Sequence, residues 1–447
     1  MRSDATAAFI RKNADADVRQ LALRGTKDPE VDLPFALDQI AGRQTARQKL
    51  PSWAAVEDII YPPHLSMEQC SSELTARYKA QITGSGDTMV DLTGGFGVDF
   101  SFMAQGFARS VYVERQEHLC DIARENFRLL GLHQAEVVCG DSVDYLQTMS
   151  PVDVIYIDPA RRDSHGGRTY DISDCTPDVL SLRDLLTAKA RRVLIKLSPM
   201  LDWRKAVSDI GEAFVSEVHI VSVANECKEL LVLVDGGLWI VEGGLWRVEG
   251  GECLVEGGGW RVEGEYSVRC VNLQPNGPAQ VFSFNPPPST LHPKTSTLHQ
   301  KPSTLHHPPS TIHHPQSTIH NPPSTLHQHY LYEPNASIMK AGCFAEVAER
   351  FGVAQVAQNS HLFTSAEPVE DFPGRSFQIE AVTSMNKREL KQHLQGLTQA
   401  NIAVRNFPLS VAELRRRLKL GEGGDVYIFA TTLEDKSHAL LITRRRF

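Results

Sequence analysis

The sequence lacks the features that would place the protein in a membrane, outside the cell or around a structural metal. It has no run of about 18 apolar residues, the length needed to cross a bilayer, and its first 17 residues (MRSDATAAFIRKNADAD) are too polar for a signal peptide. Its eight cysteines include no Cys-x-x-Cys pair, so neither a disulfide framework nor a zinc site is predicted. We therefore expect a cytoplasmic protein with reduced cysteines and no bound metal.

Positive charge is also scarce over most of the chain. The 46 Lys and Arg residues against 54 Asp and Glu residues give a net charge of -8, which argues against a protein that coats nucleic acid indiscriminately. Residues 337–447 differ, because they carry 15 basic and 12 acidic side chains. A polyanion is therefore expected to bind at the C-terminal end.

Local patterns divide the chain into a helical part and an α/β part. Residues 1–82 combine helical periodicity with Pro-containing breaks, and helices are predicted at 6–23, 35–49 and 67–82. From Thr88 onward, short apolar strands alternate with helices, which is typical of a parallel sheet. Residues 217–223 and 229–234 are too close for a helical crossover and predict an antiparallel pair. After Tyr330, a helix at 337–351 and further mixed elements predict small α+β modules.

Two tandem arrays with a period of seven residues interrupt the second half of the chain. Residues 236–263 hold four Gly-rich copies such as GGLWRVE, and residues 289–330 hold six copies of Ser-Thr-(Leu/Ile)-His followed by mostly polar residues or Pro. The glycine pairs and prolines exclude a continuous helix, so neither array is a coiled coil. We expect disordered insertions in surface loops, where added length costs little closure entropy. Metal binding by the His-rich array is the alternative interpretation.

The stretch DLTGGFGVD, residues 91–99, stands where an apolar strand ends and a helix begins. Its glycines let the backbone turn sharply and approach a ligand closely. The Gly-x-Gly-x-x-Gly spacing of a dinucleotide site is absent. The acidic residue at the strand end, Asp91, instead indicates a ligand with a cationic amino group, such as the methionine part of S-adenosylmethionine.

Three further strands are followed by a carboxylate. Glu114 can accept from both ribose hydroxyls of a cofactor, Asp141 can accept from the adenine amino group, and Asp158 follows the fourth strand. Each acid alone is equally compatible with a helix N-cap or a turn. Together they converge on the carboxyl edge of a parallel sheet, where such sheets bind ligands. The predicted cofactor-binding residues are Asp91, Thr93, Gly94, Gly95, Gly97, Asp99, Glu114, Asp141 and Ser142.

Motifs along most of the chain outside the repeats resemble one known group of enzymes. In chain order they are LSMEQCSSELTARYK, DLTGGFGVD, DPAR, KLSPMLD, NECKEL, YEPNASIMKA, NSHLFTS, RNFPLS and GGDVYIFATT. The chain is similar to the class I S-adenosylmethionine-dependent methyltransferases, in the bacterial subgroup with a ferredoxin-like segment and a THUMP-like domain. The resemblance implies a Rossmann-like α/β fold with a seven-stranded sheet, and an RNA substrate such as tRNA or rRNA.

The resemblance and the composition together predict the domain boundaries. A helical N-terminal domain (1–82) precedes the methyltransferase domain (83–235) and the Gly-rich array (236–263). A ferredoxin-like segment (264–372) is interrupted by the His-rich array, and a THUMP-like domain (373–447) follows.

The acceptor side is predicted around DPAR, residues 158–161. Amino-methylating relatives carry Asn/Asp-Pro-Pro-aromatic, in which the first residue holds an exocyclic amine and the ring stacks on the base. Here Ala160 and Arg161 replace the second proline and the aromatic residue, which argues against methylation of a base amino group. Arg161 can still stack on a base or clamp a phosphate. No cysteine follows the next strand, which runs into KLSPM, so a covalent C5 mechanism is not expected.

Lys196, in that same strand, is either a substrate-facing cation or a solvated strand-end lysine. The predicted catalytic residues are Asp158, Pro159, Arg161 and Lys196. Basic side chains near the C-terminus are predicted to bind RNA phosphates, although charge runs equally often form a solvated face. They are Arg415, Arg416, Arg417, Lys419, Arg444, Arg445 and Arg446.

Three functions are compatible with these patterns. The first is an RNA methyltransferase whose C-terminal domain grips RNA, and the second is a methyltransferase of a protein or small molecule. The third is an RNA-binding protein that keeps the cofactor fold without turnover, an alternative that the degenerate acceptor motif leaves open.

Overall fold

The computed structural model describes residues 3–161, 171–236, 239–241, 244–246, 265–287 and 330–446. They form two compact units, residues 1–279 (unit 1) and residues 280–447 (unit 2). Among the described residues, no helix is both long and apolar enough to span a bilayer.

Unit 1 begins with short helices that are separated by polar caps. The predicted helix over residues 6–23 is in fact two helices, because Asn13 caps the end of the first and the Asp17 side chain caps the start of the second. The predicted helix over 67–82 is likewise broken, and its second part starts after the N-cap Ser72. The six helices are α1 (Asp4–Lys12), α2 (Val18–Arg24), α3 (Leu33–Lys49), α4 (Pro51–Ala54), α5 (His64–Gln69) and α6 (Glu73–Thr83).

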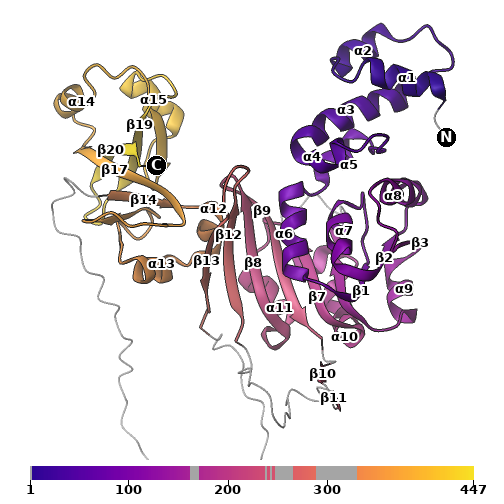
Figure 1. The fold of residues 1–447 in the computed structure, drawn as a ribbon. Helices are drawn as coiled ribbons and strands as arrows, with labels where there is room; N and C mark the ends of the chain where they lie inside the picture. The colour runs from indigo at the N-terminus through magenta and orange to yellow at the C-terminus, as the bar shows by residue number, and fades with distance from the viewer. Residues whose placement is uncertain are drawn as a thin grey trace, which may run out of the picture. The chain divides into compact units, whose positions relative to one another are not determined.

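A twisted sheet follows, and in unit 1 its strands run in the order β3-β2-β1-β4-β7-β9-β8-β12 (Figure 1). The pairs β1–β2, β2–β3, β1–β4 and β4–β7 are parallel, so the carboxyl ends of these strands share one edge. The strands are β1 (Gly86–Asp91), β2 (Phe107–Glu114), β3 (Ala135–Cys139), β4 (Val152–Ile157), β7 (Ala190–Leu197), β8 (Val215–Val223), β9 (Glu226–Asp235) and β12 (Ser267–Leu273). The crossover helices are α7 (Val98–Met103), α8 (Glu117–Leu129), α9 (Ser142–Thr148), α10 (Val179–Lys189) and α11 (Trp203–Ile210).

The predicted antiparallel pair is β8 and β9, joined by a tight turn. These strands complete the seven strands expected of a class I methyltransferase sheet, and the α/β fold class is confirmed. The sheet does not stop there, because β12 adds a parallel partner to the far side of β8. The sequence prediction missed β12, which follows the Gly-rich array. Two shorter ribbons complete the unit, β5 (Ala160–Arg161) with β6 (Cys175–Thr176) and β10 (Trp239–Val241) with β11 (Gly244–Trp246).

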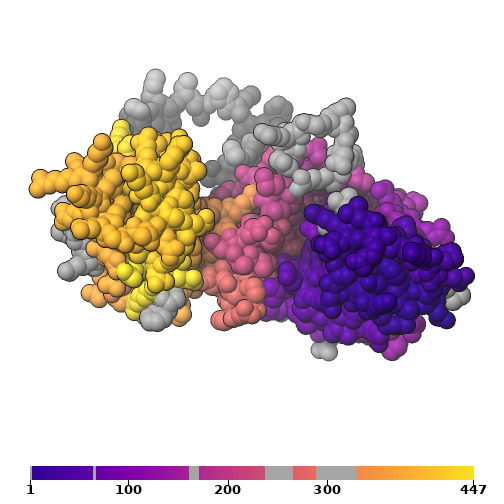
Figure 2. All heavy atoms as spheres, turned by 90° about the horizontal axis from the view of Figure 1, so that it is seen from above, coloured from indigo at the N-terminus to yellow at the C-terminus, as the bar shows by residue number. Residues whose placement is uncertain are grey.

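The N-terminal helices and the sheet domain share one hydrophobic cluster. Trp53, 1% exposed, packs against Phe96 of the DLTGGFGVD stretch with ring centroids 5.1 Å apart. The Asn126 side chain on α8 also pairs with both backbone groups of Ile60. In the space-filling view the indigo helices accordingly form one continuous body with the purple part of unit 1 (Figure 2).

Unit 2 is built on a second sheet, with the order β15-β16-β14-β17-β20-β19-β18. Its elements include β13 (Gln280–Phe284), β14 (Tyr330–Pro334), α12 (Ala336–Ala341), α13 (Phe344–Phe351), β15 (Ala354–Gln355), β16 (Phe363–Ser365), β17 (Gly374–Thr383), α14 (Lys387–His393), β18 (Asn401–Arg405), α15 (Val411–Leu418), β19 (Val426–Thr432) and β20 (His438–Arg445). The predicted helix over 337–351 is broken, because Gly342 ends α12 in a left-handed conformation. Small α+β modules were predicted for this region, and unit 2 has that character. Leucines of α14 and α15 pack on one face of the sheet, and a separate cluster around Phe377 and Phe429 covers the other.

A buried carboxylate links β14 both to its neighbour β17 and to β18 at the far edge of this sheet. Glu333 on β14, 1% exposed, accepts from Arg375 on β17 and, at 2.6 Å, from Arg405 on β18. Strands β17, β20 and β19 lie between β14 and β18. At about 4.8 Å between neighbouring strands, β14 and β18 would be about 19 Å apart in a flat sheet. The sheet must therefore curl around this ion triad.

The two tandem arrays lie almost entirely outside the described residues. Of the Gly-rich array the structure describes Gly236 and the pair β10–β11, and of the His-rich array only Tyr330 at its end. Among the described residues, no group of His, Cys, Asp and Glu has the arrangement of a metal site.

Candidate active site

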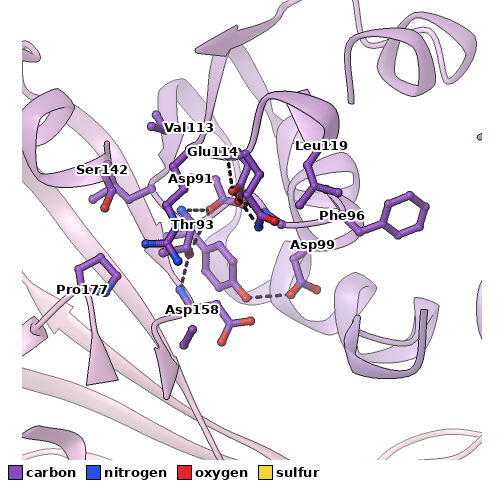
Figure 3. A pocket seen from close by; sticks show the side chains of 18 of the residues that line it. Asp91, Thr93, Phe96, Asp99, Val113, Glu114, Leu119, Ser142, Asp158 and Pro177 are labelled. Carbon is purple, nitrogen blue, oxygen red and sulfur yellow. Dashed lines mark hydrogen bonds between the residues drawn. The ribbon is translucent and has the colours of Figure 1, made fainter. Parts of the chain in front are cut away.

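A cavity of about 1080 Å³ opens at the carboxyl edge of the unit 1 sheet (Figure 3). The predicted strand-end acids all line it, namely Asp91, Glu114, Asp141 and Asp158. Four carboxylates that follow four different strands therefore lie around one cavity. The other predicted residues that line it are Thr93, Gly94, Gly95, Gly97, Asp99, Ser142 and Lys196. Residues that the sequence did not single out also contribute, namely Cys70, Ser71, Gln116, Leu119, Val143, Tyr156, Thr176 and Pro177.

The glycines of residues 91–99 are required first by the protein core and only then by a ligand. A Cβ on Gly94 would lie 2.2 Å from the Tyr112 ring, and one on Gly97 would lie 2.8 Å from the Phe127 ring. Gly97 also has a φ of +83°, at the point where α7 begins, and Gly95 has a φ of +55° with no comparable neighbour. The turn therefore packs tightly against the core on one side, and on the side of the cavity no side chain of these glycines covers its backbone.

Asp91 holds the shape of this turn. Its carboxylate is 1% exposed and accepts from the Thr93 N–H at 2.9 Å. Burial raises the pKa of Asp91 well above its usual range, and the neighbouring carboxylates of Asp99, Asp158 and Glu114 add to the rise. The Thr93 hydroxyl in turn accepts from the Asp158 N–H at 2.6 Å, so the first and fourth strand ends are fixed to each other.

Glu114 lies beside the same turn and links it to the next loop. One carboxylate oxygen accepts from the Gly95 N–H and the other from the Gln116 N–H, each at 2.9 Å. A carboxylate oxygen can accept two hydrogen bonds. The oxygen that binds the Gln116 N–H also accepts from the Gln116 side-chain amide at 3.3 Å, so the remaining capacity of Glu114 toward the cavity lies on the oxygen that binds Gly95.

Asp141 serves as a helix cap, the structural alternative considered for it. One carboxylate oxygen accepts from the N–H groups of Val143 and Asp144 at the start of α9. The side chain is exposed, and it lines the cavity beside Ser142. Capping and ligand binding are compatible here, because capping uses only one of the two oxygens.

On the acceptor side, Asp158 and Lys196 form a direct ion pair. The Lys196 ammonium donates to the Asp158 carboxylate at 2.5 Å and lies 3.9 Å from Asp99. Lys196 is therefore not a solvated strand-end lysine, since its side chain is only 16% exposed. Burial acts to lower the pKa of Lys196, but the carboxylates of Asp158, Asp99 and Glu229 outweigh it and raise the pKa. Lys196 is a fixed cation facing the cavity.

The other residues of the DPAR stretch have different environments. Pro159 is buried and Ala160 is exposed at the cavity. The backbone of Arg161 pairs with Cys175 in the β5–β6 ribbon. The side chain of Arg161 lies outside the described part of the chain, so its predicted role stays a prediction.

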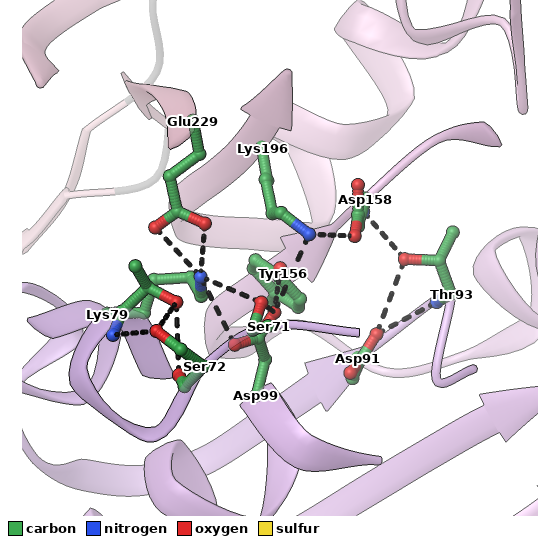
Figure 4. A network of polar contacts seen from close by, with 11 residues as sticks. Ser71, Ser72, Lys79, Asp91, Thr93, Asp99, Tyr156, Asp158, Lys196 and Glu229 are labelled. Atoms are coloured by element: carbon green, nitrogen blue, oxygen red, sulfur yellow. Dashed lines mark hydrogen bonds and ion pairs between the residues drawn. The ribbon is translucent and has the colours of Figure 1, made fainter. Parts of the chain in front are cut away.

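A buried network continues from Lys196 into the protein (Figure 4). Lys79 on α6 is 0% exposed, donates to both oxygens of Glu229 on β9 at 2.9 and 2.6 Å, and lies 3.2 Å from Asp99. Asp99 also accepts from the hydroxyls of Ser71 and Tyr156, each at 2.8 Å. Burial acts to raise the pKa of Asp99, but Lys79 and Lys196 outweigh it and the pKa is lowered. Asp99, predicted to bind the cofactor, makes these contacts within the network.

Sequence reasoning missed Lys79 and Glu229 as site residues. Both lie in quoted motifs, Lys79 at the end of LSMEQCSSELTARYK and Glu229 in NECKEL. Glu229 stands directly before the apolar run LLVLV of its strand, and a charged residue at the edge of such a run is a signal that could have indicated a buried ion pair.

The C-terminal basic residues have unequal environments. Arg415 donates to the carbonyls of Ala400 and Gly421 and so closes the end of α15. Arg416 and Arg417 are exposed on the last turn of the same helix. Lys419 is the C-cap of α15, and Arg445 is exposed. The other two predicted residues form ion pairs, Arg444 with Glu380 at 2.6 Å and Arg446 with Glu370 at 3.6 Å.

Three sequence models of protein families match parts of the chain. Residues 70–163 match protein-L-isoaspartate(D-aspartate) O-methyltransferase, residues 330–373 match a ferredoxin-like domain, and residues 374–445 match a THUMP-like domain. No curated protein matches the chain.

Solved structures extend the likeness to the whole chain. A protein of Porphyromonas gingivalis W83, described as a candidate methyltransferase, is 30% identical over 99% of this chain and 98% of its own, with a TM-score of 0.76. A candidate methyltransferase from Streptococcus mutans in complex with SAH is 15% identical over 36% of this chain and 96% of its own, with a TM-score of 0.28. The identity to the P. gingivalis protein over both full chains, with the three matched domains, shows that this chain belongs to the class I methyltransferase family with a ferredoxin-like and a THUMP-like domain.

Proposed function

We propose that the protein transfers a methyl group from S-adenosylmethionine to RNA. The observation that carries this proposal is the cavity in which the bare Gly94–Gly95 backbone, Glu114 and the Asp158–Lys196 pair face one space. The THUMP-like match at residues 374–445 supports an RNA substrate.

The residues present fit such a cofactor. Glu114 retains one acceptor site, on the oxygen that binds Gly95, for a ribose hydroxyl, and Asp141 retains one oxygen for the adenine amino group. Leu119 and Val143 supply apolar walls. The volume of about 1080 Å³ slightly exceeds the range of about 300–1,000 Å³ for small-molecule sites, which leaves room for an acceptor group as well.

The charges of the cavity match those of the ligand. Asp91, Asp99 and Asp158 surround the end of the turn, and they favour the cationic amino group and the sulfonium of S-adenosylmethionine. When bound, the cofactor supplies an electrophilic methyl group on sulfur. The protein then has to hold the acceptor in line and take up its proton.

The first prediction concerns cofactor affinity. Replacing Glu114 with Ala is expected to weaken binding of S-adenosylmethionine by about 1.5–3 kcal/mol, because hydrogen bonds to a charged acceptor are lost. That is about 10- to 150-fold in Kd by calorimetry. Glu136→Ala on the exposed side of β3 is the matched control. Unchanged affinity in Glu114→Ala would remove Glu114 from the cofactor site.

The second prediction separates RNA-binding arginines from a structural one. Replacing Arg416 and Arg417 together with Ala should weaken binding of all RNA sequences alike. The slope of log affinity against log salt should fall in magnitude by about 1.4–1.8, since about 0.7–0.9 is lost for each phosphate contact. Arg415→Ala should leave the slope unchanged and lower the midpoint of thermal unfolding, because its hydrogen bonds are internal. An unchanged slope in the double variant would favour a protein or small-molecule substrate.

A further inference from the structure

Five charged side chains form a line of alternating sign that ends in the cavity. From the interior outward they are Glu229, Lys79, Asp99, Lys196 and Asp158. The contacts along this line measure 2.6, 3.2, 3.9 and 2.5 Å (Figure 4). Each ammonium lies between two carboxylates, so each is held from two sides.

Only the outer part of the line, Asp99, Lys196 and Asp158, faces the cavity. The side chains of Lys79 and Glu229 are 0% and 3% exposed, and neither lines the cavity. Lys196 and Asp158 do line it, with side chains that are 16% and 37% exposed. An acceptor group therefore meets a hydrogen-bond donor and a hydrogen-bond acceptor that lie 2.5 Å apart.

We propose that this pair receives a hydroxyl group, and specifically the ribose 2′-hydroxyl of RNA, as the atom that is methylated. The inference rests on the proposed RNA methyltransferase function and adds the class of acceptor. A hydroxyl oxygen carries one O–H and two lone pairs. It can donate to Asp158, accept from Lys196 and still present a lone pair to the methyl group.

Other acceptors fit the pair less well. An exocyclic amine offers only donors once its lone pair faces the methyl group, which leaves the Lys196 ammonium without an acceptor from the substrate. A carboxylate offers only acceptors and would face the like charge of Asp158.

The described part of the cavity lining also favours a sugar over a base. Proteins that read an unpaired base usually stack it on an aromatic ring. Of the described lining residues only Phe96 and Tyr156 are aromatic. Phe96 packs against Trp53, and Tyr156 is 1% exposed with its hydroxyl on Asp99. Neither ring is available as a platform, and Ala160 provides none.

The chemical step balances with the groups named. An oxygen lone pair forms the new O–CH₃ bond while the S–CH₃ bond breaks and its electron pair stays on sulfur. The O–H bond breaks and its proton passes to the Asp158 carboxylate. Lys196 donates to the same oxygen and stabilises the negative charge that develops as the proton leaves. Asp99 and Lys79 are positioning residues, because Asp99 lies 3.9 Å from the Lys196 ammonium and Lys79 in turn holds Asp99.

The test uses RNA from cells that lack the gene, the purified full chain and S-adenosylmethionine labelled in its methyl group. Alkali cleaves RNA through the 2′-hydroxyl, so a 2′-O-methyl group protects the adjacent linkage. We expect the label in alkali-resistant dinucleotides. Label in mononucleotides would mean a modified base and would overturn this inference alone. No incorporation into any RNA would overturn the proposed function as well.

Variants test the two groups separately from folding and cofactor binding. Lys196→Met and Asp158→Asn are each expected to lower kcat on the order of 10²–10⁴-fold, the usual contribution of proton transfer and its partner. Calorimetric affinity of Lys196→Met for S-adenosylmethionine should change less than threefold. Lys228→Met, at an exposed lysine of the same strand as Glu229, is the matched control. Full turnover in Lys196→Met would show that this ammonium does not hold the acceptor.

Discussion

Replacing Lys79 with Met is expected to lower the free energy of unfolding of unit 1 by about 3–5 kcal/mol, the usual cost of removing one partner of a buried ion pair. The ammonium is 0% exposed and contacts the carboxylates of Glu229 and Asp99. Without this ammonium, both carboxylates stay buried and lose a neighbouring positive charge. Urea denaturation followed by tryptophan fluorescence measures this directly, because all five tryptophans lie in unit 1.

A double variant distinguishes lost charge compensation from lost packing. Lys79→Met combined with Glu229→Met removes both charges, and replacing a buried pair with apolar residues is often close to neutral. We therefore expect the double variant to regain most of the lost stability. If the single variant loses less than about 1 kcal/mol, the pair is not the buried anchor that its exposure indicates.

Replacing Gly94 with Ala is expected to abolish measurable binding of S-adenosylmethionine and to lower the stability of unit 1 by about 1–3 kcal/mol, the usual cost of overpacking. The added Cβ would lie 2.2 Å from the Tyr112 ring. That ring cannot move aside, because it is 0% exposed, packs edge-on against Phe100 and Phe127, and donates its hydroxyl to Gly95. The turn itself must therefore shift.

The matched control for this variant lines the same cavity. A Cβ on Gly140 would meet no heavy atom within 4 Å, so Gly140→Ala should fold normally. Calorimetry with S-adenosylmethionine and tryptophan fluorescence on both variants give the comparison. Equal affinity in Gly94→Ala and the wild type would mean that the turn can be displaced without loss of cofactor binding.

The convergence of the strand-end acids on one cavity could be predicted from the sequence, because it depends on local order. A short apolar strand followed by an acid can be recognised within six residues, and parallel strands bring such acids to one edge. This placed Asp91, Glu114, Asp141 and Asp158 around one cavity before the fold was known. The class I sheet followed from the same alternation of strands and helices.

The parts that were missed depend on contacts between distant segments. Lys79 and Glu229 are 150 positions apart, and no spacing rule relates a helix before the first strand to the last antiparallel strand. The hydrogen bonds of Arg415 to the carbonyls of Ala400 and Gly421 could not be predicted either, because these groups lie outside the helix that carries Arg415. Helix breaks were missed where a single cap such as Ser72 interrupts a continuous helical periodicity.

The ion triad of Glu333 bears on whether the two matched segments of unit 2 can exist separately in other proteins. The ferredoxin-like match ends at residue 373 and the THUMP-like match begins at residue 374, yet β14 of the first pairs along its length with β17 of the second. A protein that started at Gly374 would expose the edge of β17 and leave Arg375 and Arg405 without their shared carboxylate. The THUMP-like segment is therefore not a portable module, and the two matched segments can be exchanged between proteins only as a single piece.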